Sequence, residues 1–527
     1  MSSRSQGRTG RILSASVAIA LLTACAADTR PPPVAAATPM FGERMFAFGY
    51  RKLATEYLNP VDLGDLTVSG LRGLVRLDEG VDVTRTANRL VLRAGPVAAG
   101  EIELPQTNDP QRWAQVTGAA VARLSVASDR VRSAGEETIY KAVFDGVTSR
   151  LDANTRYIPR REAEQERGGR EGYGGIGVVL SETNGRPSMG DVFPDSPASK
   201  AGAQTGDVIA TIDGVEAAGL KADEVRDRLR GPIGSVVRVG VVRDGRPRTL
   251  VITRDLVVVN TVTLAMDGAV GVLRITAFNR NTPERVAAEL AEARRRSRGS
   301  LEGLVLDLRG NRGGYLQQSV TIADMFIRQG QIITTRGRHP ASGQIYNAAN
   351  DDRLDDLPMV VLVDNNSASS AEILAAALQD SGRAVLVGSN TYGKGSVQII
   401  EEMPNKGELL ITWGRIFAPS GYTFHQQGIV PNVCVNRADA TADRVLADLR
   451  AGRLRPPVML AGWRAQAPDD EAALARVKET CPSAAVDPGV TVAVAKRLIT
   501  DRALYQEALG PGARGAVAAR ETPASIP

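Results

Sequence analysis

Ser369 and Lys394 are the residues whose types and surroundings point most directly to chemistry. Ser369 lies just before a helix-favouring run, Ile373–Gln379, and the free N–H groups and positive dipole end at a helix start can stabilise an oxyanion. Lys394 is flanked by Gly393 and Gly395, and lysine, unlike arginine, can lose its proton. A neutral lysine near a serine could act as a general base, which requires its pKa to fall by about 3 units.

Each of these residues also has an ordinary structural interpretation. Ser369 and Glu372 fit the spacing of a capping box, a role that is compatible with catalysis. Lys394 alone would be a solvated loop lysine, and only Ser369 nearby would make it a base. The loop 388–395 is one residue short of a phosphate-binding P-loop, because Gly395 replaces the hydroxyl residue that holds magnesium. The residues after it favour a strand rather than the helix that a P-loop lysine opens, so nucleotide binding is not expected.

The surrounding elements predict an α/β layer structure. Apolar runs at Leu304–Leu308, Met359–Val363 and Ala384–Val387 favour buried strands. Helix-favouring runs at Pro283–Arg295 and Ile373–Gln379 alternate with them. Ser369 would therefore follow one strand, and Lys394 would follow the next.

The stretch 367–398, Ser-Ala-Ser-Ser-Ala-Glu through Gly-Lys-Gly-Ser-Val-Gln, resembles the carboxyl-terminal processing (tail-specific) serine peptidases. The resemblance implies a Ser-Lys dyad on a crotonase/ClpP-like α/β core with an inserted β-rich PDZ domain. It aligns Ser369 with the nucleophile, Lys394 with the general base and Gln398 with the residue that orients the lysine. On a strand, Lys394 and Gln398 would face the same way. The segment 147–158 is similar to the family segment that precedes the PDZ domain.

The resemblance also implies an oxyanion hole at the glycine loop 309–314. Gly313 or Gly314, together with the N–H of Ser370, are the candidate donors. The family usually has Asn-Asn-Pro-Gly-Gly here, whereas this chain has Gly310 and Arg312 in place of the first Asn and the Pro. A plain strand-to-helix glycine turn is the alternative interpretation.

Residues 173–253 resemble a PDZ domain, because a Gly-rich turn, two further turn segments, a helix at Ala222–Leu229 and closing strands occur in the family order. In such a domain a turn presents backbone N–H groups to a C-terminal carboxylate, and the tail adds as a strand. The predicted carboxylate loop is Gly174, Gly175, Ile176 and Gly177.

The first residues favour an export signal. Three arginines precede the apolar run Ile12–Leu22, which is too short to span a bilayer as a mature helix. Leu22-Thr-Ala-Cys25 resembles a bacterial lipobox, which implies lipidation of Cys25 and attachment to a membrane. Ala26 favours the outer membrane, and a signal peptide cut elsewhere is the alternative.

Export places the two remaining cysteines, Cys434 and Cys481, in an oxidising compartment, which predicts one disulfide between them. No CxxC or histidine cluster suggests a metal site, so neither a metal nor a cofactor is expected. The net charge of +5 is dispersed and aromatic residues make up 4% of the chain, which argues against nucleic-acid binding.

The chain divides into successive segments by composition and pattern. They are a signal peptide (1–24), a tether (25–40), a mainly helical N-terminal region (41–168), the PDZ domain (169–256), the peptidase core (257–437), a helical extension (438–509) and a disordered tail (510–527). Helical spacing marks Phe46–Tyr57, Leu66–Leu77, Glu137–Leu151, Ala440–Leu449 and Thr491–Leu509, a hairpin is expected from Leu90–Ala94 and Glu101–Leu104, and Glu162–Arg170 is interpreted as a charged linker. Asp380 is interpreted as a structural partner of Arg383 rather than a catalytic acid.

The sequence thus predicts a lipid-anchored periplasmic endopeptidase that takes protein substrates with apolar C-termini. Two other functions stay open at this stage. One is an inactive PDZ scaffold that binds tails without cleaving them, and the other is a Ser-His hydrolase that uses His425 or His339. The sequence also leaves open an adaptor lipoprotein and a homo-oligomer.

Overall fold

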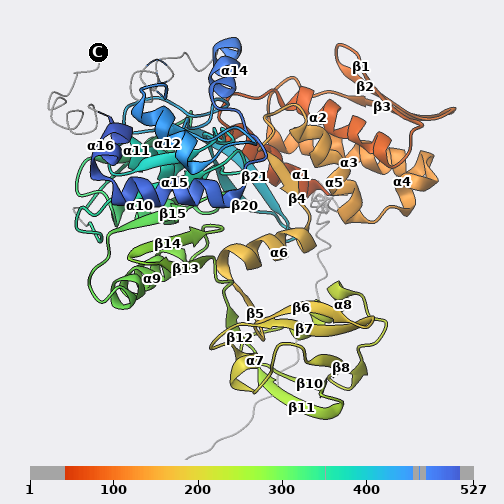
Figure 1. Ribbon diagram of the computed structural model, residues 1–527. Helices are drawn as coiled ribbons and strands as arrows, with labels where there is room; N and C mark the ends of the chain where they lie inside the picture. The colour runs from red at the N-terminus through yellow and green to blue at the C-terminus, as the bar shows by residue number, and fades with distance from the viewer. Residues whose placement is uncertain (1–41, 350–351, 455–461, 463, 465–469, 511–527) are drawn as a thin grey trace, which may run out of the picture.

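The computed structural model describes residues 42–349, 352–454, 462, 464 and 470–510. The predicted signal peptide and tether, Cys25 included, lie outside the described residues, as does the predicted tail after Gly510. Figure 1 shows a helical N-terminal region beside a large α/β core, and a smaller β-rich body that hangs below them from helix α6.

The core is built on a six-stranded sheet in the order β13-β14-β15-β18-β19-β22. Its strands are Val262–Asp267, Val270–Ile275, Gly303–Asp307, Met359–Val363, Val385–Gly388 and Val433–Cys434. Only β13 runs antiparallel, to its hairpin partner β14, and the remaining pairs are parallel. Strands β15, β18 and β19 are buried throughout, as expected for parallel strands covered on both faces.

Helices cover both faces of this sheet. One apolar cluster packs α9 (Thr282–Arg296), α10 (Leu316–Asp324) and α11 (Ser370–Asp380) against one face. Another cluster packs α12 (Ala442–Arg450), α15 (Pro488–Thr500) and α16 (Arg502–Leu509) against the other face. The predicted α/β core is therefore confirmed, and α11 is the helix that follows Ser369.

A second sheet carries the segment after Lys394. Its order is β17-β16-β21-β20, with strands Gln344–Asn347, Gln331–Arg336, Glu408–Phe417 and Ser396–Glu402, and β4 (Arg156–Ile158) also pairs with β21. Strand β20 begins two residues after Lys394, so this lysine enters the sheet from a loop.

The N-terminal region is mainly helical, as predicted. Its elements are α1 (Glu43–Glu56), α2 (Leu63–Arg72), η1 (Gly73–Arg76), β1 (Val81–Arg85), β2 (Arg89–Ala94), β3 (Val97–Glu103), α3 (Pro110–Ala127), α4 (Asp129–Ser133) and α5 (Glu136–Thr148). The expected hairpin is β2–β3, and β1 extends it to three strands. Phe46, Tyr50 and Phe144 are fully buried where α1 meets α5.

The predicted charged linker at Glu162–Arg170 is wrong: this segment forms helix α6, Arg160–Glu171. Only Ala163 and Gly168 are buried on it, so no apolar stripe marked it in the sequence. Charge pairs one turn apart, Arg160 with Glu164 and Glu166 with Arg170, support the helix instead.

The smaller β-rich body, residues 178–253, is called the PDZ body because it lies within the predicted PDZ domain. It contains a sheet in the order β11-β10-β8-β7-β6, and β9 pairs with β8. The strands are Arg246–Thr253, Val236–Arg243, Val208–Ile212, Arg186–Val192, Val178–Thr183 and Val215–Glu216, and the helices are α7 (Pro197–Lys200) and α8 (Ala222–Leu229). A two-stranded ribbon, β5 (Tyr173–Gly175) with β12 (Asp255–Val257), connects this body to the rest of the chain.

The C-terminal extension is helical, with α14 (Glu471–Thr480) before α15 and α16. The run Thr491–Leu509 is not one helix, because Asp501 leaves the helical conformation and its side chain caps α16 by accepting the N–H of Leu504. No helix in the described ranges is long and apolar enough to cross a membrane.

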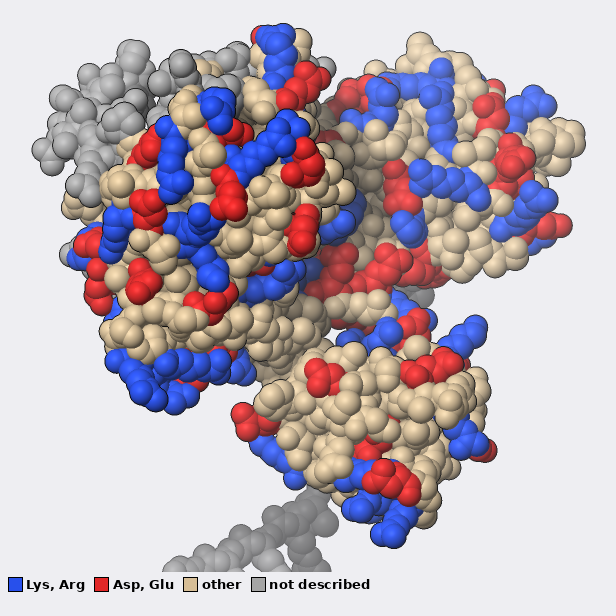
Figure 2. Space-filling view, in the orientation of Figure 1, with Lys and Arg blue, Asp and Glu red and all other residues tan. Residues whose placement is uncertain are grey.

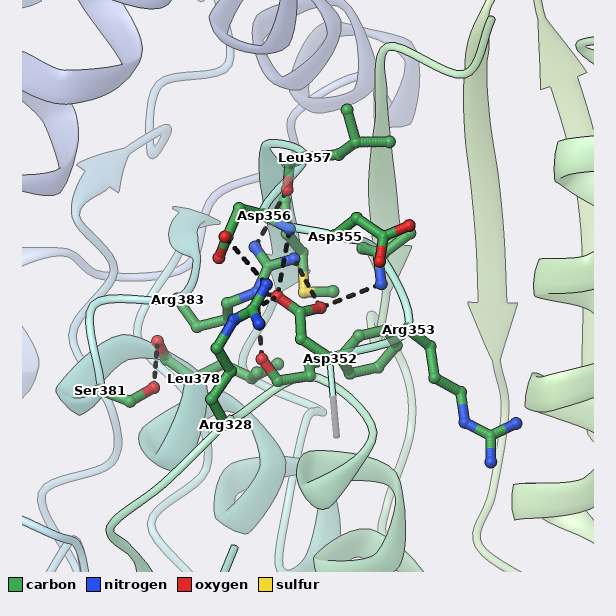
Figure 3. Close-up of polar contacts among 12 residues, drawn as sticks. Arg328, Asp352, Arg353, Asp355, Asp356, Leu357, Leu378, Ser381 and Arg383 are labelled. Atoms are coloured by element: carbon green, nitrogen blue, oxygen red, sulfur yellow. Dashed lines mark hydrogen bonds and ion pairs between the residues drawn. The ribbon is translucent and has the colours of Figure 1, made fainter. Parts of the chain in front are cut away.

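The predicted pairing of Asp380 with Arg383 is also wrong. Arg383 contacts the buried carboxylate of Asp352, and its guanidinium also donates to the carbonyl of Leu357 (Figure 3). Asp380 instead pairs with Arg464 and accepts hydrogen bonds from Ser420. Arg383 lies just after the end of α11, and it pairs with Asp352 because tertiary packing brings these two residues together.

Candidate active site

Ser369 lies on the turn that joins β18 to α11. Its φ of 56° and ψ of −117° form a conformation that a residue with a side chain rarely adopts. The surroundings hold this conformation: the N–H of Ala368 donates to the carbonyl of Asn311 at 2.9 Å, and the N–H of Ser369 donates to Glu372 at 2.9 Å. The turn therefore fixes the serine at the start of the helix.

Glu372 connects this turn to the loop that carries Lys394. Its carboxylate is fully buried and accepts the N–H groups of Ser369, Gly393 and Lys394 at 2.9, 2.6 and 2.8 Å. It also accepts the hydroxyl of Thr391 at 2.5 Å. Burial raises the pKa of this carboxyl, and the hydrogen bonds oppose that rise. In the sequence Glu372 was visible only as half of a capping box; its contacts with the lysine loop come from the fold.

Lys394 is half-buried in the wall of a cleft. Burial lowers the pKa of its ammonium group, and the positive charge of Arg156 lowers it further, while Asp152 and Glu372 act in the opposite direction. The net result is a lowered pKa, which shifts the equilibrium toward the neutral amine, the form that can accept a proton.

One cleft of about 530 Å³ brings the predicted site residues together. It is lined by Ser369, Ser370, Gly313, Gly314, Lys394 and Gln398, among others. Residues far apart in the chain thus meet where α11 begins and β20 enters its sheet.

Gln398 and Lys394 line the same cleft, as expected for residues that face the same way, but in the part of the chain that the structure describes no hydrogen bond joins their side chains. Lys394 lies before β20, and the register shift between β20 and β21 places the extra residue, Trp413, on β21, so the alternation along β20 is kept. The amide of Gln398 donates to the hydroxyls of Ser396 at 2.9 Å and Thr412 at 3.3 Å.

Two residues before the PDZ body join this polar network. Asp152 accepts the hydroxyl of Thr412 at 2.8 Å, and Asn154 donates to the hydroxyl of Ser396 at 3.3 Å. Neither residue was predicted to belong to the site. The likeness of segment 147–158 to the family was the only signal available for them.

The glycine loop packs directly against the serine turn. A Cβ at Gly313, where φ is +100°, would lie 2.8 Å from the Cβ of Ser369, so glycine is required. The N–H of Gly313 already donates to the side chain of Asn311 at 2.8 Å. Gly314 and Phe278 form an isolated parallel β-bridge. The carbonyl of Gly314 accepts a hydrogen bond from the hydroxyl of Ser370 at 3.0 Å.

Both histidines lie away from the cleft that holds Ser369. His425 lines a second cavity, which Lys394 also lines, and burial lowers the pKa of its ring to about 4. His339 caps the short helix η2 (Pro340–Ser342) by accepting the N–H of Ala341. Among the described residues, no group of three or more His, Cys, Asp or Glu side chains is placed to hold a metal ion.

Cys434 and Cys481 form a disulfide. Cys481 ends α14, and its carbonyl accepts the N–H of Asn390, while the ammonium of Lys478 donates to the carbonyl of Tyr392. The disulfide thus ties the C-terminal extension to the loop that leads to Lys394.

In the PDZ body a small groove lies between β6 and α8. Ile176, Gly177, Val178, Leu180 and Leu229 supply its apolar lining, and Tyr173, Arg226 and Arg230 complete it. Of the predicted carboxylate loop, Ile176 and Gly177 reach this groove, whereas Gly174 and Gly175 pair with β12 in the connecting ribbon.

Comparisons with protein families and with known sequences agree with this architecture. Residues 269–435 match the model of peptidase family S41, and residues 190–243 match that of the PDZ domain. The carboxy-terminal-processing protease of Bartonella bacilliformis is 32% identical over 332 residues, which are 61% of this chain and 76% of that protein. The carboxyl-terminal-processing protease of Synechocystis is 34% identical over 273 residues, 50% of this chain and 62% of that protein. Among solved structures, the photosystem II D1 C-terminal processing protease is 26% identical with a TM-score of 0.34, and the alignment covers 70% of this chain and 92% of that one.

An α/β core with a serine-bearing cleft and an attached PDZ domain define a PDZ-containing serine peptidase. The chain belongs to peptidase family S41, together with the carboxy-terminal-processing proteases that it resembles.

Proposed function

We propose that this protease cleaves peptide bonds with a Ser-Lys dyad, in which Ser369 is the nucleophile and Lys394 the general base. The observation that carries the proposal is that the amides of both residues bond to the one carboxylate of Glu372, while both line one cleft. The lowered pKa of Lys394 supports its role as a base.

In the acylation step, the neutral amine of Lys394 takes the proton of the Ser369 hydroxyl as its oxygen attacks the substrate carbonyl. The negative charge that develops on the carbonyl oxygen needs N–H donors. Ser370 is the first residue of α11, so its N–H has no acceptor within the helix. In the parallel bridge the residues on either side of Gly314 bond to Phe278, so the N–H and the carbonyl of Gly314 both point away from Phe278. The carbonyl of Gly314 accepts the hydroxyl of Ser370 on that side. We therefore propose Ser370 and Gly314 as donors ahead of Gly313, whose N–H bonds to Asn311.

The reaction then proceeds through an acyl-enzyme. The protonated Lys394 returns its proton to the leaving amine as the peptide C–N bond breaks, and the substrate carbonyl stays bonded to Ser369 as an ester. Lys394 next takes a proton from water, and the resulting hydroxide attacks the ester carbon. The bond between that carbon and the Ser369 oxygen then breaks, Lys394 gives its proton to this oxygen, and the product leaves as a carboxylic acid. Gln398 acts as a positioning residue through the start of β20, because it bonds to Ser396 and Thr412.

The PDZ body is proposed to capture the C-terminal tails of exported proteins. Its groove offers an apolar lining for a terminal side chain, and the turn at Ile176 and Gly177 lies at the groove for a carboxylate. Cleavage would take place in the periplasm, with the protein attached to the outer membrane through lipidated Cys25. This location rests on the sequence of the first residues alone, and labelling with a radioactive fatty acid, lost in Cys25→Ala, tests it.

The first experiment measures cleavage of an unfolded reporter protein that ends in an apolar tail. Wild-type mature protein is compared with Ser369→Ala and Lys394→Ala, and with the double variant His339→Ala/His425→Ala. The dyad predicts cleavage by wild type and by the histidine variant only. A Ser-His hydrolase predicts that the histidine variant cleaves nothing. Equal cleavage by all four proteins overturns the dyad.

A PDZ scaffold that binds without cleaving remains the second candidate, and the altered glycine loop at Gly310 and Arg312 is what favours it. The scaffold predicts that wild type and Ser369→Ala bind the reporter with the same affinity and that neither protein cuts it. The assay is then repeated with any adaptor lipoprotein that co-purifies with the protein from its native host. Cleavage in its presence identifies an enzyme that lacked its activator, and binding without cleavage identifies a scaffold.

A further inference from the structure

Arg312 occupies a fixed position in the wall of the catalytic cleft. The residue before it, Asn311, is fully buried, and its side chain donates to the carbonyl of Ile275 at 2.9 Å and accepts the N–H of Gly313 at 2.8 Å. Gly313 in turn packs against Ser369. The backbone of Arg312 is thus held on both sides next to the serine turn, while its own side chain is exposed and lines the cleft.

The charges that line the cleft are unequal. Of the residues that the structure describes, only one carboxylate, that of Glu166, lines the cleft, but four cationic side chains do: those of Arg156, Arg170, Arg312 and Lys394. Glu166 lies 3.2 Å from the guanidinium of Arg156 and 3.5 Å from that of Arg170, which also pairs with Glu408 at 2.7 Å.

Arg312 is the arginine of this cleft that has no such partner. Within the described ranges, no carboxylate lies within 4 Å of its guanidinium, and the guanidinium makes no hydrogen bond. A fixed backbone, an exposed charged head and an open cleft in front of it are the conditions for binding an anionic group that arrives from outside.

We propose that Arg312 binds a carboxylate of the substrate beside the scissile bond, so that the protease favours substrates with an acidic group near the cleavage site. This inference rests on the proposed role of Ser369 as the nucleophile. A guanidinium presents a planar fork that matches a carboxylate with two parallel hydrogen bonds. The carboxylate can come from an Asp or Glu side chain, or from the C-terminus itself when the cut falls within a few residues of it.

The test uses the full mature protein and reporters that share one apolar C-terminal tail. The cleavage site of the wild type is first mapped by mass spectrometry. Single Asp residues are then placed at each of three positions on either side of the bond, and each reporter is paired with one that carries Asn, which matches Asp in shape but not in charge. The measured quantity is the ratio of kcat/KM for the Asp reporter to that for the Asn reporter.

We expect the wild type to favour Asp about 5-fold at one position, the size expected for a partly exposed ion pair. Arg312→Gln should lower this ratio to about 1, and Arg312→Lys should keep part of it, because it retains the charge without the fork. Arg298→Gln is the matched control, since Arg298 is exposed just after α9 and does not line the cleft; it should leave the ratio and the activity unchanged.

The two sources of the carboxylate are separated by a second reporter set whose cleavage site lies about ten residues from the C-terminus, beyond the reach of an arginine in the cleft. An Asp preference that persists there identifies a side chain. A loss of kcat/KM in Arg312→Gln that is confined to reporters cut near their end identifies the terminal carboxylate.

The proposal is overturned if wild type cleaves the reporters with no preference at any position and Arg312→Gln cleaves all of them equally well, or if the preference survives in Arg312→Gln. These results would leave the dyad intact. Cleavage by Ser369→Ala at the wild-type rate, or no cleavage of any reporter by wild type, would instead remove the proposed function on which the inference depends.

Discussion

The backbone amides of Ser369 and Lys394 donate to the same oxygen atom, Oε2 of Glu372, at 2.9 and 2.8 Å. Oε1 of the same carboxylate accepts Thr391 and Gly393. The serine turn and the lysine loop are therefore held by one buried group, and a displacement of that group moves both. Small misplacements of reacting groups lower rates steeply, so Glu372 is a positioning residue with large expected effects.

Glu372→Gln should reduce kcat at least about 100-fold with a smaller change in KM. The amide nitrogen of glutamine would face N–H donors that now bond to an oxygen, and each buried donor left without an acceptor costs about 1–3 kcal/mol. Loss of the negative charge also lowers the pKa of Lys394 further, because Glu372 raises it. The acid limb of the kcat/KM profile should thus move to lower pH as kcat falls.

Glu302→Gln is the matched control for that experiment, because Glu302 is exposed just before β15. It should leave kcat and the pH profile unchanged. A Glu372→Gln protein with normal kcat, or one whose acid limb stays in place, would contradict the positioning role.

Arg156→Gln should move the acid limb of kcat/KM to higher pH. Lys394 must be neutral to accept a proton, so activity rises as the pH passes through its pKa. Arg156 lowers that pKa, and its loss removes this effect. The freed Glu166, which raises the pKa of Lys394, acts in the same direction. Arg160→Gln, on the same helix as Glu166 but paired with Glu164, should not move the limb. A shift to lower pH in Arg156→Gln would refute this account.

Replacing both Cys434 and Cys481 by serine should lower the free energy of unfolding of the core by about 4 kcal/mol, the chain-entropy estimate for a sequence separation of 47. Activity should fall as well, because the carbonyl of Cys481 holds Asn390 in the loop before Lys394. Urea denaturation and reporter cleavage measure the two effects. Treatment of the wild type with a reductant should reproduce both, and an unchanged unfolding midpoint would show that the extension holds this loop without the disulfide.

Glu408→Gln should destabilise the protein by about 3 kcal/mol. The Glu408 carboxylate is almost fully buried in contact with Arg167 and Arg170, and removal of one partner leaves the other charges uncompensated. Because both arginines lie on α6, hydrogen exchange of residues 160–171 should accelerate. Glu402→Gln should change little, because its exposed carboxylate pairs with Lys406 and lies farther from Arg167, at 3.5 Å, than that of Glu408, at 3.0 Å. Equal effects of the two variants would mean that the ion pairs with Glu408 do not hold α6.

Much of this protein could be predicted from its sequence, because the relevant signals are local. Apolar runs such as Met359–Val363 and Val385–Gly388 marked the parallel strands, and their alternation with helices indicated the α/β core. The strand that follows Lys394 excluded a P-loop, since β20 begins at Ser396. The motif around Ser369 gave the family, which the relatives of this chain establish.

Other features of the structure could not be predicted, because they depend on contacts between segments that are far apart in the sequence. Helix α6 has no apolar stripe, so its charge pairs and its contact with Glu408 were needed to find it. The hydroxyl of Thr412, which accepts the amide of Gln398, comes from the neighbouring strand β21, and no sequence pattern marks that pairing. Arg383 found Asp352 rather than Asp380 because the loop before β18 folds back onto the end of α11.

The sequence by itself therefore determined the family, the α/β and PDZ architecture, and the types of residue available for the chemistry, since these follow from motifs and hydrophobic periodicity. Only the tertiary structure decided that Glu372 joins the serine turn to the lysine loop and that Lys394 is half-buried near Arg156. It also decided that Arg312 lines the cleft with no carboxylate of the described residues beside it. The physical reason is that burial and electrostatic environment depend on which distant segments pack together, and a pKa or an unpaired charge exists only after that packing is complete.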